Sequence, residues 1–194
     1  QDGPIYWAHS FEVSFVGVPA PTPARRAVLA WNHAIPAESV TEDFLTLFDS
    51  TIAWMVANEA GATICFSPAP AGTGDEVLAD RLRANGYTVT TDEDVAAPVP
   101  AADAYIHSSS GDLGVPGRLT SVAKPVLTYR ATDHDDLLVS SIGQTVTFTP
   151  GDATIQAADH PAAGGKIGSF PILSGGDVSL DLIGDVLPGG ATVV

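Results

Sequence analysis

The amino-acid sequence predicts an α/β fold, in which a parallel sheet is flanked by helices and extra antiparallel β strands lie near the two ends of the chain. Between residues 62 and 129 short apolar runs alternate with a helical segment and polar loops, which is the pattern of strand–helix–strand units. Such units join parallel strands through right-handed crossovers. A strongly amphipathic helix precedes this region, and short β-rich runs follow it.

The first sixty residues predict strands and one long helix. Residues 4–18 loosely alternate apolar and polar positions, which predicts one or two strands. The fully apolar run AVLAW at 27–31 predicts a buried strand. Ser39 and Glu42 have the spacing of a capping box and predict the start of a helix over 40–58. The side chains of this helix that recur at helical spacing are Phe44, Phe48, Ile52 and Met55.

The middle of the chain predicts four strands and a second helix. This helix begins at Thr73, where Thr73 and Glu76 again have capping-box spacing, and it ends at Asn85 and Gly86. The predicted strands span 62–66, 87–90, 104–107 and 125–129. After about residue 140 the runs TVTFT, ATIQA, VSLDLIG and ATVV predict antiparallel strands.

Charge and composition exclude several classes of function. The formal net charge is -15, from 8 Lys and Arg against 23 Asp and Glu, which argues against nucleic acid and anionic membranes as partners. No apolar run is long enough to insert into a membrane, and the single Cys excludes an intrachain disulfide. The first residue is Gln, which indicates either a processed and exported chain or a boundary within a longer sequence. We predict an extracellular or cell-surface location.

Several segments carry a resemblance to a known superfamily. They are ATICF with ADRLRANGYTVT, then ADAYIHSSSGDLG, KPVLTYRATDHDDL and DHPAAGG. In this order they resemble the class I glutamine amidotransferase-like superfamily, and most closely its trehalose-utilisation-protein-like branch. The resemblance implies a flavodoxin-like or amidotransferase-like parallel sheet.

The order of the segments implies a circular permutation of this fold. ARRAVLAWNHA and LTLFDSTIAWM resemble the closing strand and helix of such domains, yet they stand first. We interpret 1–194 as a single domain, with the closing strand and helix in 1–60, the βαβ core in 61–140 and a β-rich extension in 141–194. Two other interpretations stay open: a slice of a tandem array, and a subunit that exchanges 1–60 with a neighbour.

The catalytic cysteine of the superfamily is missing. The resemblance places the nucleophile near Tyr129 or Arg130, and neither residue can serve as that nucleophile. Cys65 lies between Ile64 and Phe66 in a predicted buried strand, where a thiol behaves as a small apolar group. The sequence therefore leans against an enzyme.

Two polar loops are candidate ligand sites at the carboxyl end of the predicted sheet, where α/β domains bind ligands. The first loop supplies small hydroxyls that suit an anion or a glycan, and its candidates are His107, Ser108, Ser109, Ser110 and Asp112. The second supplies carboxylates that suit a hard cation such as Ca²⁺, and its candidates are Asp133, Asp135 and Asp136. The competing interpretations are a plain Ser/Gly turn and a solvated helix start. We predict no other cofactor.

The function predicted from the sequence is a non-catalytic extracellular structural or interaction module. Its apolar, strand-like terminal segments predict head-to-tail assembly into a homo-oligomer, a filament or a surface layer. The candidate assembly residues are Ile5, Trp7, Phe11, Val13, Phe15, Thr192, Val193 and Val194. The alternative is a carbohydrate-binding or hydrolase-like domain with its ligand at the carboxyl end of the sheet.

Overall fold

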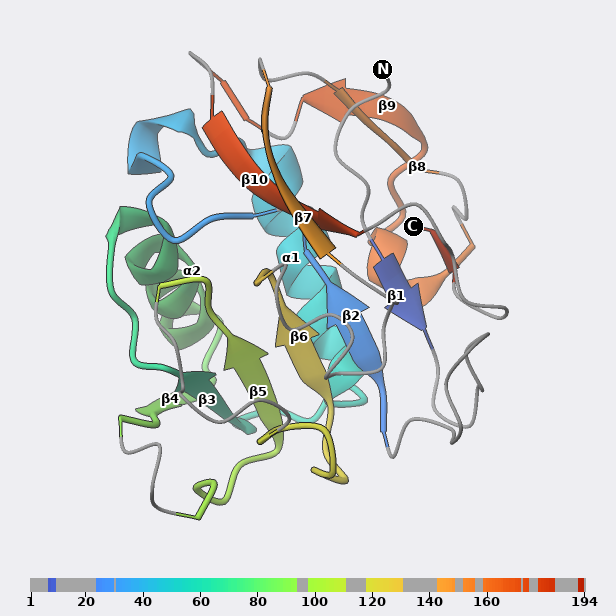
Figure 1. Cartoon of the computed structure of the whole chain (residues 1–194). Helices are drawn as coiled ribbons and strands as arrows, with labels where there is room; N and C mark the ends of the chain where they lie inside the picture. Colours follow the sequence, from blue (N-terminus) through green and yellow to red (C-terminus); the bar gives the residue numbers. More distant parts are fainter. Residues whose placement is uncertain are drawn as a thin grey trace.

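A computed structural model gives the arrangement of the chain (Figure 1). It describes residues 24–29, 31–93, 98–110, 118–130, 159–171 and 173–174. It also describes the backbone of residues 7–9, 143–148, 152–155, 178–183 and 192–193.

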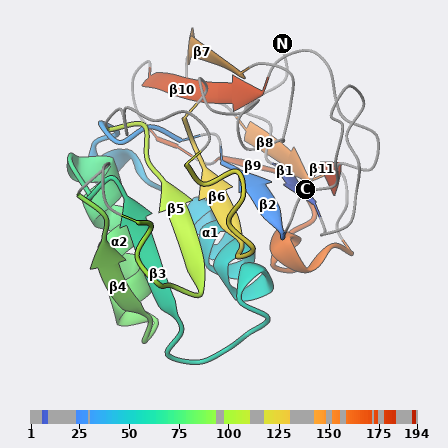
Figure 2. The same ribbon diagram turned by 60° about the horizontal axis from the view of Figure 1, so that its bottom comes forward.

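Five neighbouring parallel strands make up most of a seven-stranded sheet and extend to one of its edges (Figures 1 and 2). They are β2 (Arg26–Val28), β3 (Thr63–Ser67), β4 (Thr88–Thr91), β5 (Ala104–His107) and β6 (Val126–Thr128). Their order across the sheet is β2-β6-β5-β3-β4. The predicted α/β fold with a flavodoxin-like parallel sheet is confirmed. Counted from β3 and ending with β2, this order is the 2-1-3-4-5 order of flavodoxin-like sheets.

The sheet continues past β2 through strands from both ends of the chain. β1 (Trp7–His9) pairs antiparallel with β2 on one side and with β11 (Thr192–Val193) on the other. Two further antiparallel pairs lie outside this sheet: β7 (Gly143–Phe148) with β10 (Val178–Ile183), and β8 (Asp152–Ile155) with β9 (Gly168–Pro171). Extra antiparallel strands near the termini are thus confirmed. The β9 strand was not predicted, because its sequence GSFP contains a Gly and a Pro that are rare inside strands.

Both helices pack on one face of the sheet (Figure 2). They are α1 (Glu42–Met55) and α2 (Thr73–Ala84), and their apolar side chains share one core with the strands. Trp31 stacks on Phe44 with ring centroids 4.3 Å apart, which joins the segment after β2 to α1. The 3₁₀ helix η3 (Pro161–Ala163) contributes Ala162 and Ala163 to the same core. The predicted amphipathic helix is therefore confirmed, with its apolar face against the sheet.

The opposite face of the sheet has a smaller core under the loops around 98–102 and 118–125. Cys65, Tyr105 and Val126 face this side. The loop at 118–124 is held by Arg26, whose guanidinium is fully buried and donates to the backbone carbonyls of Lys124 (2.8 Å), Val122 (3.0 Å) and Thr120 (3.3 Å). Burial lowers the pKa of Arg26 to about 10. A buried arginine therefore organises this loop through carbonyl oxygens.

Both helices begin differently from the capping boxes predicted. The N-cap of α1 is Thr41, whose hydroxyl accepts the Phe44 N–H at 3.2 Å, while Ser39 ends the preceding 3₁₀ turn η1 (Ala37–Ser39). The α2 helix begins after Gly72 with no side-chain cap. The Thr73 hydroxyl instead donates to the Ile35 carbonyl at 2.8 Å. At Thr73 a tertiary contact thus uses the hydroxyl that local spacing would assign to capping.

A short turn of residues 57–61 joins α1 to β3. Asn58 N–H donates to the Ala53 carbonyl at 2.7 Å and Ala57 N–H to the Trp54 carbonyl at 3.3 Å, which is a Schellman motif. Ala57 and Asn58 both have left-handed backbones, with φ of 53° and 60°. Glycine is the usual residue at the first of these positions, so the alanine is strained.

We expect Ala57→Gly to stabilise the fold by about 0.5–1 kcal/mol, because glycine removes the steric conflict of a left-handed alanine. The free energy of unfolding from urea titration measures this change. Gly61→Ala is the matched control, since Gly61 has φ 73° and a Cβ there would meet nothing within 4 Å. It should destabilise by about 1 kcal/mol through backbone strain alone. A destabilising Ala57→Gly would contradict the interpretation.

Candidate functional site

The polar residues of interest gather where the parallel strands end. β5 ends at His107 and continues into Ser108, Ser109 and Ser110, while β6 is followed directly by Tyr129. In both Figure 1 and Figure 2 the β7–β10 pair lies beyond this carboxyl end of the sheet. The region is therefore the place where an α/β domain would bind a ligand.

A buried carboxylate, Asp75 in the first turn of α2, joins these segments. Its Oδ2 accepts the Ser108 hydroxyl at 2.7 Å and the Ala71 N–H at 3.1 Å, and its Oδ1 accepts the Tyr129 hydroxyl. Asp75, Ser108 and Tyr129 are each fully buried. Burial, and then the negative charge of Asp75, raise the pKa of Tyr129 well above its usual value. Tyr129 therefore stays a neutral donor, and we call these three residues the Asp75 hub.

A second contact joins the loop after β2 to the same region. The Ser109 hydroxyl accepts the His33 N–H at 3.2 Å and lies 3.0 Å from His33 Nδ1. The His33 carbonyl accepts the Gly74 N–H at 2.8 Å. A Cβ on Gly74 would lie 2.5 Å from the Asn32 carbonyl oxygen, so only glycine permits this close approach. The loop after β2, the loop after β5 and the start of α2 thus meet.

On the other face of the sheet lies a buried ion pair. Asp92, 2 % exposed, is 2.6 Å from the Arg118 guanidinium and accepts the Ser67 hydroxyl at 3.0 Å. His107 is 4 % exposed and ends β5. Its strand neighbour Ile106 belongs to the helix-covered core, so strand alternation places His107 on the face of Asp92. The two buried carboxylates therefore serve opposite faces.

The predicted site residues fall into three groups. Ser108 is buried in the Asp75 hub, and His107 is buried on the opposite face. Ser109 and Ser110 are half-buried, and the Ser110 hydroxyl lies 2.9 Å from the Ser108 hydroxyl. Outside the described residues lie Asp112, the cation candidates Asp133, Asp135 and Asp136, and the assembly candidates Ile5, Phe11, Val13, Phe15 and Val194. Of the other assembly candidates, Trp7, Thr192 and Val193 lie in paired strands described by their backbone.

The sequence does not single out Asp75 or His33 as site residues. It indicates Tyr129 only at the nucleophile position, and not as a hydrogen-bond donor to Asp75. Asp75 has the pattern of an ordinary acidic residue in a first helical turn, and nothing local shows that its partners are Ser108 and Tyr129. Their positions in the chain are the one signal that the sequence offers: Tyr129 directly follows β6, Asp75 lies in the first turn of α2, and His33 lies in the loop after β2.

Tyr129 and Cys65, the two residues considered above for covalent catalysis, are both buried. Tyr129 stands where the resemblance places the nucleophile, and its hydroxyl is already bonded to Asp75. Cys65 is fully buried in the middle of β3, and burial is the main cause that raises the pKa of its thiol. A thiol with a raised pKa is a poor nucleophile.

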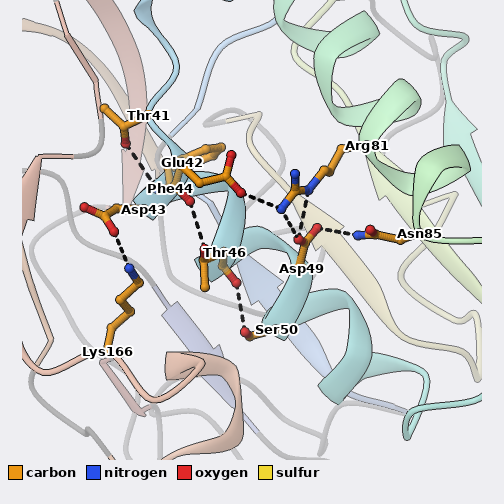
Figure 3. Close-up of polar contacts among 10 residues, drawn as sticks. All are labelled: Thr41, Glu42, Asp43, Phe44, Thr46, Asp49, Ser50, Arg81, Asn85 and Lys166. Atoms are coloured by element: carbon orange, nitrogen blue, oxygen red, sulfur yellow. Dashed lines mark hydrogen bonds and ion pairs between the residues drawn. The ribbon is translucent and has the colours of Figure 1, made fainter.

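The basic side chains of the described residues form ion pairs and hydrogen bonds within the chain. Figure 3 shows Arg81 of α2 between Asp49 and Glu42 of α1, with nitrogen–oxygen distances of 2.7 and 2.8 Å. In the same view Lys166 pairs with Asp43. Hydrogen bonds or ion pairs within the chain involve Arg25, Arg26, Arg81, Arg83, Arg118, Lys124 and Lys166, and Arg130 also has an intrachain interaction. The excess charge is therefore carried by carboxylates.

Three further searches, for metal-binding clusters, for membrane-spanning helices and for similar proteins, assign no function to the described residues. Within the described ranges no group of three or more His, Cys, Asp and Glu side chains is placed to hold a metal ion. No helix in the part of the chain that the structure describes has the length and apolar character to cross a bilayer. Comparisons of the chain with known protein families, with curated proteins and with solved structures give no match.

The His160 side chain couples the packing of η3 to pH. Its Nδ1 accepts the Ala162 N–H at 3.2 Å, which requires a neutral ring, and the ring meets Trp54 edge-on at 5.2 Å. Burial first, and then the positive charge of Arg25, lower the pKa of His160 against an opposing effect of Asp159.

We expect stability to fall as pH drops below the unfolded-state His value of about 6.5, because the unfolded chain then binds more protons than the folded one. Above that pH the contribution of His160 should be constant. Urea titrations from pH 7.5 to 5 test this against His160→Asn, which keeps a capping acceptor and does not titrate. An equal slope in both proteins would contradict the role of His160.

The Asp75 hub should dominate local stability. We expect Asp75→Asn to destabilise the fold by about 2–4 kcal/mol, because two buried hydroxyl donors lose their charged acceptor. Tyr129→Phe should cost about 1–3 kcal/mol. Asp80→Asn is the matched control at an exposed carboxylate, where about 0.5 kcal/mol or less is expected. An Asp75→Asn protein as stable as the Asp80→Asn protein, by urea titration, would refute the hub.

Proposed function

We propose that this chain is a non-catalytic structural or interaction module that associates with copies of itself at an extracellular or cell-surface location. The observation that carries this proposal is the Asp75 hub. The three polar side chains of the hub lie at the carboxyl end of the sheet, where a ligand would be recognised, and they are bonded to one another and buried.

The chemistry of the same region supports the absence of catalysis. Acyl transfer needs an accessible nucleophile activated by a base. The described candidates fail this requirement, because Cys65 is buried with a raised thiol pKa and Tyr129 is a buried donor to Asp75. The Ser109 hydroxyl does lie beside the His33 ring, but it also accepts the His33 backbone N–H. This pair of contacts is typical of a side chain that holds two loops together.

The terminal strands support a role in assembly. β1 and β11 bring the two ends of the chain together at one edge of the sheet, and β11 is the outermost strand there. Thr192 and Val193 lie in this outermost strand, and Trp7 lies in the neighbouring strand opposite Val193. An outermost strand that a neighbouring copy can reach supports the proposal of assembly. A net charge of -15 favours neither nucleic acid nor anionic membranes as partners.

A glycan-binding module is the second candidate function. The half-buried hydroxyls of Ser109 and Ser110 lie at the carboxyl end of the sheet, where they can donate to a sugar. A calcium ion held by Asp133, Asp135 and Asp136 would be compatible with either function.

The test is the mass of the particles in solution. We expect light scattering after size exclusion to show species larger than the monomer, increasing with protein concentration, and negative-stain images to show regular particles or filaments. Added NaCl should promote association, because salt screens the repulsion between chains of net charge -15. A monodisperse monomer at every protein and salt concentration would refute self-association.

A thermal-shift screen with sugars and Ca²⁺ tests the second candidate function on the same preparations. A sugar-dependent shift that Ser109→Ala abolishes would favour glycan binding over a structural role. Asp80→Asn serves as the surface control in this screen.

A further inference from the structure

We propose that copies of this chain associate by exchanging their N-terminal unit, defined as the segment through Val56 that contains β1, β2, η1 and α1. The body is defined as the segment from Ala62 onward. In the associated form the N-terminal unit of one copy completes the sheet of another copy. This inference rests on the proposed self-association and names its mechanism.

The pairing of β1 is the first reason for exchange. β1 is bonded to β2 on one side and to β11 on the other within a single copy. A strand paired on both sides has no free edge for a neighbour. Within the described residues β11 is paired on one side only, so this restriction applies to β1. β1 can join two copies only if its partners within one copy are replaced by the same partners from another copy.

The topology is the second reason. β2 and β3 are joined through α1, yet β6 and β5 lie between them in the sheet. The described part of the N-terminal unit is connected to the body through the turn at 57–61 alone, and all its other contacts with the body are non-covalent. Every one of those contacts can be made equally well by a second copy, because the body that receives the unit is chemically identical.

The contacts between unit and body are extensive enough that neither can remain without the other. β2 pairs with β6, and the Leu29 N–H donates to the Thr128 carbonyl at 2.9 Å. The guanidinium of Arg26 is bonded to carbonyls of the body, and Arg81 of the body binds Asp49 of the unit. A body without a unit would expose the apolar face of its core, so the open form is stable only when a second copy fills the position.

The turn at 57–61 has the properties of a hinge. All five of its residues are exposed, so extending it uncovers no core. Ala57 and Asn58 have left-handed backbones at φ of 53° and 60°, and this strain is released when the turn opens. Short hinge loops under strain favour domain swapping. The open state loses the two Schellman hydrogen bonds and keeps the contacts between unit and body.

Exchange also explains how a head-to-tail assembly could form. If each copy gives its unit to the next, the contact is heterologous and the chain of copies is open-ended. If two copies exchange units with each other, the result is a closed dimer. Both products contain the same unit-to-body contacts.

A cross-linking experiment distinguishes exchange from surface association. The Asn85 amide of the body donates to Asp49 of the unit at 2.7 Å (Figure 3), so Asp49→Cys and Asn85→Cys place two thiols at the junction. Cys65→Ala removes the native thiol. The protein is refolded at high concentration, separated by size exclusion, treated with a short bis-maleimide and analysed on a denaturing gel. We expect bands of two or more linked chains from the oligomer fraction and single-chain bands from the monomer fraction.

Hinge variants change the balance between the two forms. Deleting Glu59 and Ala60 should leave the turn too short for the N-terminal unit to reach the body of its own chain. The unit can then bind only the body of another copy, so most of the protein should become oligomeric. Ala57→Gly, which relaxes the closed turn, is the matched control and should leave more monomer than the parent. If the shortened protein does not fold, cross-linking of the full-length hinge decides the question.

Two results overturn the proposal in distinguishable ways. Oligomers that give only single-chain bands would exclude exchange and leave self-association standing. Monomers alone, in the parent after refolding at high concentration and in any hinge variant that folds, would overturn both.

Discussion

The pairing of β2 with β6 is the constraint on which the rest of the structure depends. It aligns Arg26 with Val126, residues far apart in the sequence, in a parallel ladder. This register directs the Arg26 side chain to the carbonyls of the 118–124 loop and lets α1 cross back over the sheet towards β3. The loop after β2 then reaches the start of α2, where Gly74 permits a close backbone contact. A non-local pairing thus positions both helices and one covering loop.

The two buried carboxylates are compensated by different chemistry. Asp75 is surrounded by neutral donors, the hydroxyls of Ser108 and Tyr129 and a backbone N–H, whereas Asp92 is paired with the guanidinium of Arg118. A buried charge left without such partners would destabilise the fold strongly, because the free-energy cost of removing an ion from water is larger than the free energy gained from weak contacts. At the end of the sheet where many α/β proteins bind ligands, both carboxylates thus make contacts that stabilise the fold.

Sequence periodicity predicted the elements whose character is local. The strand at 62–66 and the helix with Phe44 and Ile52 facing inward follow from apolar spacing, and the structure contains both. The Ser39 cap was wrong by two residues, because Ser39 belongs to a 3₁₀ turn and Thr41 caps the helix. The Asp75 hub could not be predicted, since its partners directly follow β5 and β6, and single-sequence patterns give no distances between these strands and α2. Cation candidates such as Asp133 lie outside the described residues and remain predictions.

The late position of β6 in the chain has a consequence for biosynthesis. During translation the apolar segment around β2 leaves the ribosome about a hundred residues before its partner strand exists, because domains complete their long-range pairings only when the later strand has been made. In that interval Ala27, Val28 and Leu29, all buried in the finished sheet, lack the part of their native surroundings that β6 and the 118–124 loop supply. The nascent chain is therefore expected to need a chaperone or transient local collapse at this stage.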